Sequence, residues 1–370
     1  MRLERGPVMV VDLTAMRANF RLLVRLSAGR CAAVVKGDGY GHGMIPSAQA
    51  LLAAGADLFF AARLDDALRL RECLPAAATV AFLDGARGAD MAEAIRAGLA
   101  PVINNPGQLE AALAAARRTG TRVRAFVHID TGLNRLGFAA RDMRHLAAAV
   151  GDLDVRAYMT HLASADDLDL DLCRRQVTRL RSAVRHLPPA PLSIANSCGL
   201  FLSRRLHGAI TRPGKAAFGI NPLPGDRNPM AQPARVLAPV VQVRDLVKGD
   251  PVGYASTWRA PGRRRIAILA IGYSNGYRRS ASNAGTVAFD GRMAPVVGRV
   301  SMDLTAADVT ALPDVGLGSI AEIVGPTISY RSLARSEGTN EHEALIGLGA
   351  GCPRIYLDHA PAAAVVEEAA

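Results

Sequence analysis

Eight short apolar segments alternate with stretches of helical period through the first part of the 370-residue chain. The segments occupy residues 31–36, 58–62, 79–84, 100–103, 123–130, 155–162, 191–197 and 208–212. This alternation is typical of βα units, which build parallel sheets. Eight units predict an α/β fold, a closed (β/α)8 barrel over residues 10–230. An open doubly wound sheet is the competing fold, but no G-x-G-x-x-G fingerprint follows the first strand.

The pattern changes near residue 235. Strand-like runs separated by Gly and Pro replace the helical period. We therefore expect a C-terminal all-β domain over residues 231–370, with residues 1–9 as a candidate addition to it. The stretch at 223–233 is rich in Pro, Gly and Asn and is the expected linker.

The net charge of +11 raises the question of nucleic-acid binding, since basic clusters bind phosphates. The arginines are scattered over predicted helices with few aromatic residues among them, so we do not expect a nucleic-acid partner. No apolar run is long enough for a membrane span, and the first residues lack the apolar core of a signal peptide. We expect a cytoplasmic protein without a membrane partner.

The cysteines and histidines do not predict a metal centre. The five cysteines are widely spaced and form no C-x-x-C pair, so we expect reduced thiols. His42, His128 and His145 have no second ligand three or four residues further on. No metal site is predicted.

Catalytic groups of a (β/α)8 barrel lie at the carboxyl ends of its strands. The polar residues expected there are Lys36, Asp130, His161, Asn196, Ser197 and Arg212. Lys36 ends an apolar strand, where partial desolvation lowers the pKa of an amine and favours the nucleophile that a Schiff base needs. The alternative is a lysine that extends its amine to the surface.

The segment AVVKGDGYGHG around Lys36 resembles the cofactor-lysine signature of alanine racemases. The likeness continues in order through HIDTGLNRLG, MTHLASADD, IANSCGL, TRPGKAAFGINP, GYASTW, IGYSNGYRR and GRVSMDLTAADV, over roughly residues 5–325. The resemblance implies a pyridoxal 5'-phosphate enzyme that interconverts L-alanine and D-alanine, a peptidoglycan precursor. It also implies a homodimer whose active sites are shared between subunits.

The resemblance implies two catalytic residues, Lys36 and Tyr254. Lys36 would hold the cofactor and serve as one acid/base, and Tyr254 would act on the opposite face from the second subunit. Racemisation needs two such groups because one face of the α-carbon loses a proton while the other gains one. A hydrogen-bonded chain would run from Tyr254 through His161 to Arg212, which faces the pyridine nitrogen.

The resemblance also implies binding residues for the cofactor and for a small amino acid. The cofactor set is Lys36, Tyr40, His161, Asn196, Ser197, Arg212, Gly214 and Lys215. The substrate set is Arg135, Met302, Tyr273 and Asp303. Taken one at a time these residues have structural explanations, such as a turn glycine or a surface cation. Their joint occurrence at strand ends and inside the motifs favours a site.

Two departures from the family pattern bear on binding. His128 stands where the family has a lysine, carbamylated in many members, so Arg135 would be positioned by a bound anion, another carboxylate or neutral His128. Ala350 stands where a tyrosine reaches the phosphate, so phosphate affinity would depend on Lys215 and Tyr40. Asn275 in place of aspartate and Gly37 in place of alanine do not touch the core chemistry.

Other functions remain open at this point. A racemase of the same fold could act on serine or on a basic amino acid, because specificity depends on the volume above the α-carbon. A non-catalytic cofactor-binding barrel would lack the β domain that carries Tyr254. A decarboxylase of related architecture would need acidic or cysteine residues in matching motifs of the second domain, and DNA binding is a remote alternative.

Overall fold

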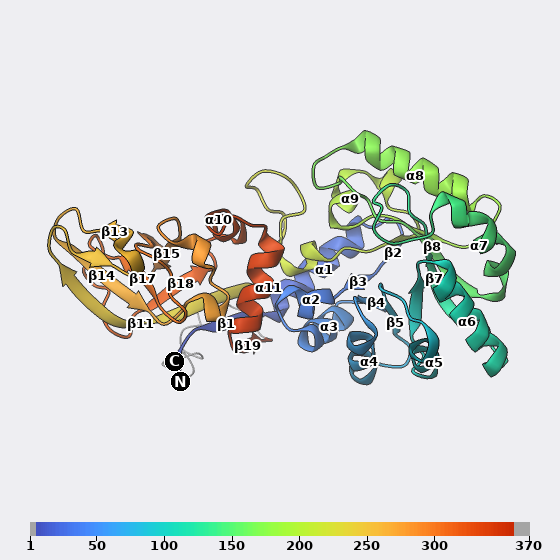
Figure 1. Ribbon diagram of the computed structural model, residues 1–370, viewed down its shortest axis with the longest axis horizontal. Helices are drawn as coiled ribbons and strands as arrows, with labels where there is room; N and C mark the ends of the chain where they lie inside the picture. The colour runs from blue at the N-terminus through green and yellow to red at the C-terminus, as the bar shows by residue number, and fades with distance from the viewer. Residues whose placement is uncertain (1–4, 359–370) are drawn as a thin grey trace.

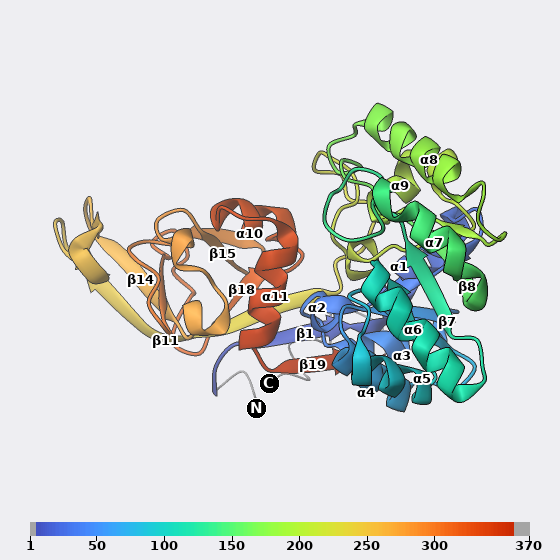
Figure 2. The same cartoon turned by 45° about the vertical axis from the view of Figure 1, so that its right-hand side comes forward.

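The structure is a computed structural model that describes residues 5–358 and has two lobes joined along its long axis (Figure 1). Residues 1–4 and 359–370, parts of the expected β domain and its N-terminal addition, lie outside the described residues. A barrel forms one lobe and a strand-rich domain the other. The strands β1 (Val8–Asp12) and β11 (Ala234–Leu246) extend between them (Figure 2).

The first lobe is a closed parallel barrel, which confirms the predicted (β/α)8 fold. β2 and β3 flank Ala32 as two parts of one barrel strand; β2 pairs with β10 and β3 with β4, so the sheet closes. The strands are β2 (Arg30–Cys31), β3 (Ala33–Val34), β4 (Leu58–Ala61), β5 (Thr79–Phe82), β6 (Ala100–Ile103), β7 (Arg124–His128), β8 (Asp154–Met159), β9 (Leu192–Ser193) and β10 (Ile210–Thr211). Each lies within or beside a predicted segment.

Apolar side chains fill the barrel interior. Phe60 and Phe126 meet edge to face with ring centroids 5.1 Å apart, and Val34 and Met159 pack in the same cluster. A filled interior leaves the polar strand ends at the mouth as the place for chemistry.

Helices surround the barrel strands. They are α1 (Leu13–Leu26), α2 (Lys36–Tyr40), α3 (Met44–Ala53), α4 (Leu64–Cys73), α5 (Gly88–Arg96), α6 (Pro106–Thr119), α7 (Met143–Ala149), α8 (Leu170–Val184) and α9 (Ser197–Leu202). Helix α1 begins after Asp12 because the Asp12 carboxylate accepts hydrogen bonds from the amides of Thr14 and Ala15, at 2.8 and 2.9 Å.

The second lobe is mostly strand. Its strands are β12 (Pro251–Val252), β13 (Trp258–Arg259), β14 (Arg264–Leu269), β15 (Thr286–Phe289), β16 (Arg292–Pro295), β17 (Thr305–Asp308), β18 (Ile320–Val324) and β19 (Arg354–Leu357). β1 joins this lobe, antiparallel to β11 and parallel to β19. The expected domain boundary at residue 10 therefore falls inside a strand of the second sheet.

Two helices interrupt the predicted all-β domain, α10 (Tyr330–Ser336) and α11 (Glu341–Gly351). The Asn340 side chain caps α11 by accepting from the amide of Glu343 at 3.0 Å. Helix α11 is rich in Gly, Leu and Ala and packs against both lobes, so it lacks the one-sided apolar pattern that reveals a surface helix.

Close backbone contacts join α11 to the barrel mouth. Gly41 ends α2 with φ +86°, and a Cβ there would collide with the carbonyl oxygen of Leu345. A Cβ at Gly349 would collide in turn with the carbonyl oxygen of Gly41. Only glycines allow the helix to approach this closely.

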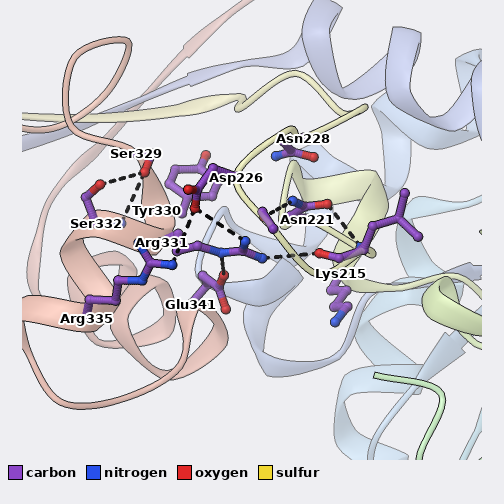
Figure 3. Close-up of polar contacts among 12 residues, drawn as sticks. Lys215, Asn221, Asp226, Asn228, Ser329, Tyr330, Arg331, Ser332, Arg335 and Glu341 are labelled. Carbon is purple, nitrogen blue, oxygen red and sulfur yellow. Dashed lines mark hydrogen bonds and ion pairs between the residues drawn. The ribbon is translucent and has the colours of Figure 1, made fainter. Parts of the chain in front are cut away.

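Ion pairs form a second connection, between the linker and the helices of the second lobe (Figure 3). Arg331 of α10 lies 3.7 Å from the Asp226 carboxylate and 3.3 Å from that of Glu341, and it donates to the carbonyl oxygen of Leu223 at 3.2 Å. Arg335 reaches Asp226 at 3.4 Å. The linker is thus held against α10 rather than free.

We predict that Gly41→Ala lowers the stability of the folded chain by more than about 2 kcal/mol, since it adds a backbone collision to the cost of positive φ. Gly55→Ala is the matched control, because Gly55 has φ +101° but open space around it. Thermal unfolding of both variants measures the difference. Equal losses in the two proteins would contradict a close contact between α2 and α11.

Candidate active site

A cavity of about 210 Å³ lies among the carboxyl ends of the barrel strands. Of the residues predicted for the site, it is lined by Lys36, Tyr40, Arg135, His161, Asn196, Ser197, Arg212, Gly214 and Lys215. These residues come from five different segments of the sequence, each of which follows a barrel strand. The fold therefore brings together one large part of the predicted set.

Lys36 follows β3 directly and enters an unusual turn. Residues 37–40 all have positive φ, between +50° and +62°, which makes a short left-handed turn that glycines at 37 and 39 favour. The Asp38 side chain holds this turn by accepting from the amide of Met44 at 2.8 Å and pairing with Arg354 at 2.7 Å. Backbone strain of this kind clusters at functional sites, where a side chain is held in one orientation.

The Lys36 amine is largely removed from water. Burial lowers its pKa, and the nearby charge of Arg135 lowers it further, against a smaller opposite effect of Asp84. A lowered pKa increases the fraction of neutral amine, which is the nucleophilic form. The surface alternative for this lysine does not hold.

The cavity lining also includes a polar cup suited to an anion. Ser197 Oγ accepts from the amides of Gly214 and Ala216, at 3.0 and 3.2 Å. A Cβ at Gly214 would collide with the hydroxyl of Tyr40, whose ring stacks on Phe218 at 4.9 Å. Hydroxyls, amides and a close glycine make a polar cup that a larger residue would fill.

Lys215 adds a cation to the cavity lining, next in sequence to Gly214 of the cup. Its Nζ lies 3.1 Å from a carboxylate oxygen of Asp166, and its side chain is only 13% exposed. Burial acts to lower the pKa of Lys215, but its polar neighbours Cys198 and Asp166 outweigh burial and leave the pKa raised. The amine is thus protonated at neutral pH.

Sequence reasoning missed three lining residues with titratable side chains: Asp166, Cys198 and His342. Asp166 and Cys198 lie inside quoted motifs and could have been found from that position. His342 comes from α11, and its ring centroid is 5.8 Å from that of Tyr40. No local signal indicates it, because it depends on how α11 packs on the barrel.

Arg212 is a fixed buried cation. It donates to Ser193 Oγ at 2.6 Å and to the carbonyl oxygens of Thr160 and Ile194 at 2.5 and 3.4 Å. Burial lowers its pKa to about 10, so it stays charged near neutral pH. Burial first, and then the charges of Arg212 and Arg135, lower the pKa of His161 to about 3. His161 is therefore neutral.

Four predicted residues lie away from this cavity, on loops of the second lobe: Tyr254, Tyr273, Met302 and Asp303. All four side chains are exposed, Tyr254 to 68% and Met302 to 55%. Hydrogen bonds join two of these loops. The backbone amide of Ser274 donates to the carbonyl oxygen of Met302 at 2.9 Å, and the Ser274 hydroxyl donates to the Asp303 carboxylate at 2.6 Å. Within one chain the predicted site is thus split in two.

Within residues 5–358, no three His, Cys, Asp or Glu side chains are grouped so that they could hold a metal ion. The helices in this range are all too short or too polar to span a membrane.

Comparison with known proteins decides the family. The alanine racemase N-terminal domain model matches residues 11–222, and the alanine racemase C-terminal domain model matches residues 234–356. This chain belongs to the alanine racemase family. It is therefore a member of a family of enzymes.

Individual members of the alanine racemase family match over nearly the whole chain. A catabolic alanine racemase of Mesorhizobium japonicum is 38% identical, covering 95% of this chain and 93% of its own length. An alanine racemase of Acidiphilium cryptum is 39% identical, covering 93% and 96%. The crystal structure of alanine racemase from Bartonella henselae with covalently bound pyridoxal phosphate superposes with a TM-score of 0.91 at 30% identity, covering 95% of this chain and 99% of that one.

Proposed function

We propose that this protein is a pyridoxal 5'-phosphate-dependent alanine racemase that uses two bases, Lys36 and Tyr254 of the partner subunit. The observation that carries the proposal is one cavity lined both by a partly desolvated amine and by an anion cup. A cofactor with an aldehyde and a phosphate group needs an amine to react with the aldehyde and an anion site to hold the phosphate. We further propose that the enzyme works in the cytoplasm and supplies D-alanine.

The residues present fit this cofactor. Lys36 would hold it covalently, and the cup of Ser197, Gly214 and Tyr40 would hold its phosphate. The cup has no Cβ at 214, and its Ser197 hydroxyl already lies within reach of two amides, so a phosphate oxygen would find donors arranged around it. Lys215 would add charge where the family tyrosine is replaced by Ala350.

When bound, the cofactor supplies an electron sink for the charge left at the α-carbon. Arg212 faces this part of the cavity as a guanidinium that keeps its protons, because it is bonded on three sides and its pKa stays near 10. It would offer charge and hydrogen bonds without transferring a proton. We infer that this restrains side reactions of the cofactor.

The chain's own groups would then move the protons. Lys36 Nζ would exchange the α-proton on one face, and the phenol oxygen of Tyr254 of the partner subunit on the other. Tyr254, Tyr273, Met302 and Leu304 are all exposed in the single chain. Exposed large apolar side chains are typical of an interface, which supports a homodimer.

Substrate would enter beside Arg135, whose guanidinium would bind the amino acid's carboxylate in a bidentate manner. Arg135 lines the same cavity as Lys36, and its charge acts on the amine. In the closed dimer we expect Tyr273 and the loop of Met302 and Asp303 from the partner to cover this entrance. The volume that this cover leaves above the α-carbon would decide between alanine and the alternative substrate serine.

We predict that Lys36→Ala and Tyr254→Phe homodimers each lose alanine racemisation, while a mixture regains about a quarter of wild-type activity. One site of each mixed dimer combines the intact Lys36 of one chain with the intact Tyr254 of the other. Racemisation is followed by the optical rotation of L-alanine, after the mixed proteins have been unfolded and refolded together.

Unmixed homodimers treated in the same way are the control. No recovery in the mixture would contradict a site shared between subunits. Faster turnover of L-serine than of L-alanine by the wild type would favour the alternative substrate.

We predict that Lys215→Ala weakens binding of pyridoxal 5'-phosphate about tenfold, because it removes a buried cation from the phosphate end. Titration of the apoenzyme, followed by absorbance, measures the dissociation constant. Lys248→Ala is the matched control, since Lys248 is exposed in the second lobe. Equal affinities in the two variants would show that Lys215 does not contact the phosphate.

A further inference from the structure

Asn104, directly after β6, fixes the state of the His128 ring. Its amide nitrogen donates to the carbonyl oxygens of Leu83 and Val102, at 2.9 and 3.1 Å, and lies 3.4 Å from Gln108 Oε1. The nitrogen end of the amide thus faces acceptors only. The other end, Oδ1, lies 2.9 Å from Nδ1 of His128. Because an amide oxygen can only accept, Nδ1 of the ring carries the proton.

His128 is buried and neutral. Burial lowers its pKa to about 4, with a smaller contribution in the same direction from the charge of Arg212. A neutral imidazole has one protonated and one unprotonated nitrogen. With the proton on Nδ1, Nε2 keeps a lone pair that can accept a hydrogen bond.

The loop that carries Arg135 lies against the Nε2 side of the ring. Its two ends are joined, since the amide of Phe138 donates to the carbonyl oxygen of His128 at 2.8 Å and that of Asp130 donates to the carbonyl oxygen of Phe138 at 3.1 Å. Gly137 is so close that a Cβ would lie 3.2 Å from Cδ2, the ring carbon bonded to Nε2. Arg135 and His128 line the same cavity.

We infer that His128, held by Asn104 with its proton on Nδ1, accepts a hydrogen bond at Nε2 from the Arg135 guanidinium and so positions it for the substrate carboxylate. His128 is a positioning residue in this account. Only the role given to Arg135, which is to bind the substrate carboxylate, rests on the proposed function. It explains how the site works with histidine where the family has a lysine that becomes an anion.

The neighbouring carboxylate is engaged elsewhere. Asp130 Oδ1 accepts from the backbone amides of residues 132–134 at 3.0, 3.0 and 3.1 Å and so shapes the loop. Asn134, next to Arg135, has φ +55°, which this cap stabilises. Asp130 thus sets the path of the loop that carries Arg135. The His128 imidazole packs against the part of this loop that returns to β7, at Gly137 and Phe138.

The first test is the tautomer of His128 in the holoenzyme. We expect long-range proton–nitrogen NMR spectra, with histidine rings labelled with ¹⁵N, to show a protonated Nδ1 and an unprotonated Nε2 at pH 7. His207 is an internal control of opposite form, because its Nδ1 accepts from the amide of Ala28 at 3.1 Å and its Nε2 lies 2.9 Å from the carbonyl oxygen of Leu200. A proton on Nε2 of His128, or on both nitrogens, would overturn the inference.

The second test uses propionate as a carboxylate probe. We expect His128→Phe to weaken propionate binding to the holoenzyme about tenfold and to raise the KM for alanine more than it lowers kcat, since a charged hydrogen bond is lost. His128→Gln keeps an acceptor oxygen and should lose less. The cofactor's dissociation constant should stay the same in both variants.

Unchanged propionate affinity in His128→Phe would overturn the inference, as would wild-type binding that requires added chloride, which would identify a bound anion as the support of Arg135. The NMR measurement on the wild type stands even where a variant fails to fold. Neither the tautomer nor propionate binding depends on turnover. A lack of racemisation together with the expected tautomer and affinities would therefore reject only the proposed function.

Discussion

The desolvation of one amine at the end of an apolar strand is the constraint on which the rest of this site depends. Lys36 can be neutral and nucleophilic because the barrel mouth removes it from water and Arg135 lies nearby. The left-handed turn of residues 37–40 orients the Lys36 side chain. Gly41 has no Cβ that would collide with the backbone of α11, so α11 can pack over that turn. Fold stability and amine chemistry are thus linked through the same few residues.

The basic groups that line the cavity differ in their charge. Arg212 is a cation fixed by three acceptors, Lys215 is a cation paired with Asp166, and His161 in the same cavity is kept neutral. A bound phosphate and a bound carboxylate would each meet positive charge, while the reacting amine would not compete for protons with an imidazolium. Burial is the main influence on the pKa values of His161 and Arg212, whereas at Lys215 the neighbours Cys198 and Asp166 outweigh burial.

The barrel could be predicted because its strands are short apolar runs, several of which end in a polar residue, a pattern local to a few positions. Helix α11 could not, because its sequence is Gly-rich and its exposed positions include the apolar residues Ile346 and Ala350, so no polar face marks it as a surface helix. His342 was missed for the same reason. The lining residues from Lys36 to Lys215 could be named from motifs, whereas the dependence of His128 on Asn104 required the distance between two loops. Tyr254, Tyr273, Met302 and Asp303 remain predictions, since their surface is exposed in one chain.

The most direct test of the account is to locate the covalent attachment point. The purified protein is saturated with pyridoxal 5'-phosphate, reduced with borohydride and digested, and the labelled peptide is identified by mass spectrometry. We expect the phosphopyridoxyl group on Lys36 and not on Lys215, which lines the same cavity but is protonated by its pairing with Asp166. A label on Lys215 or Lys248, or no label, would contradict the central claim.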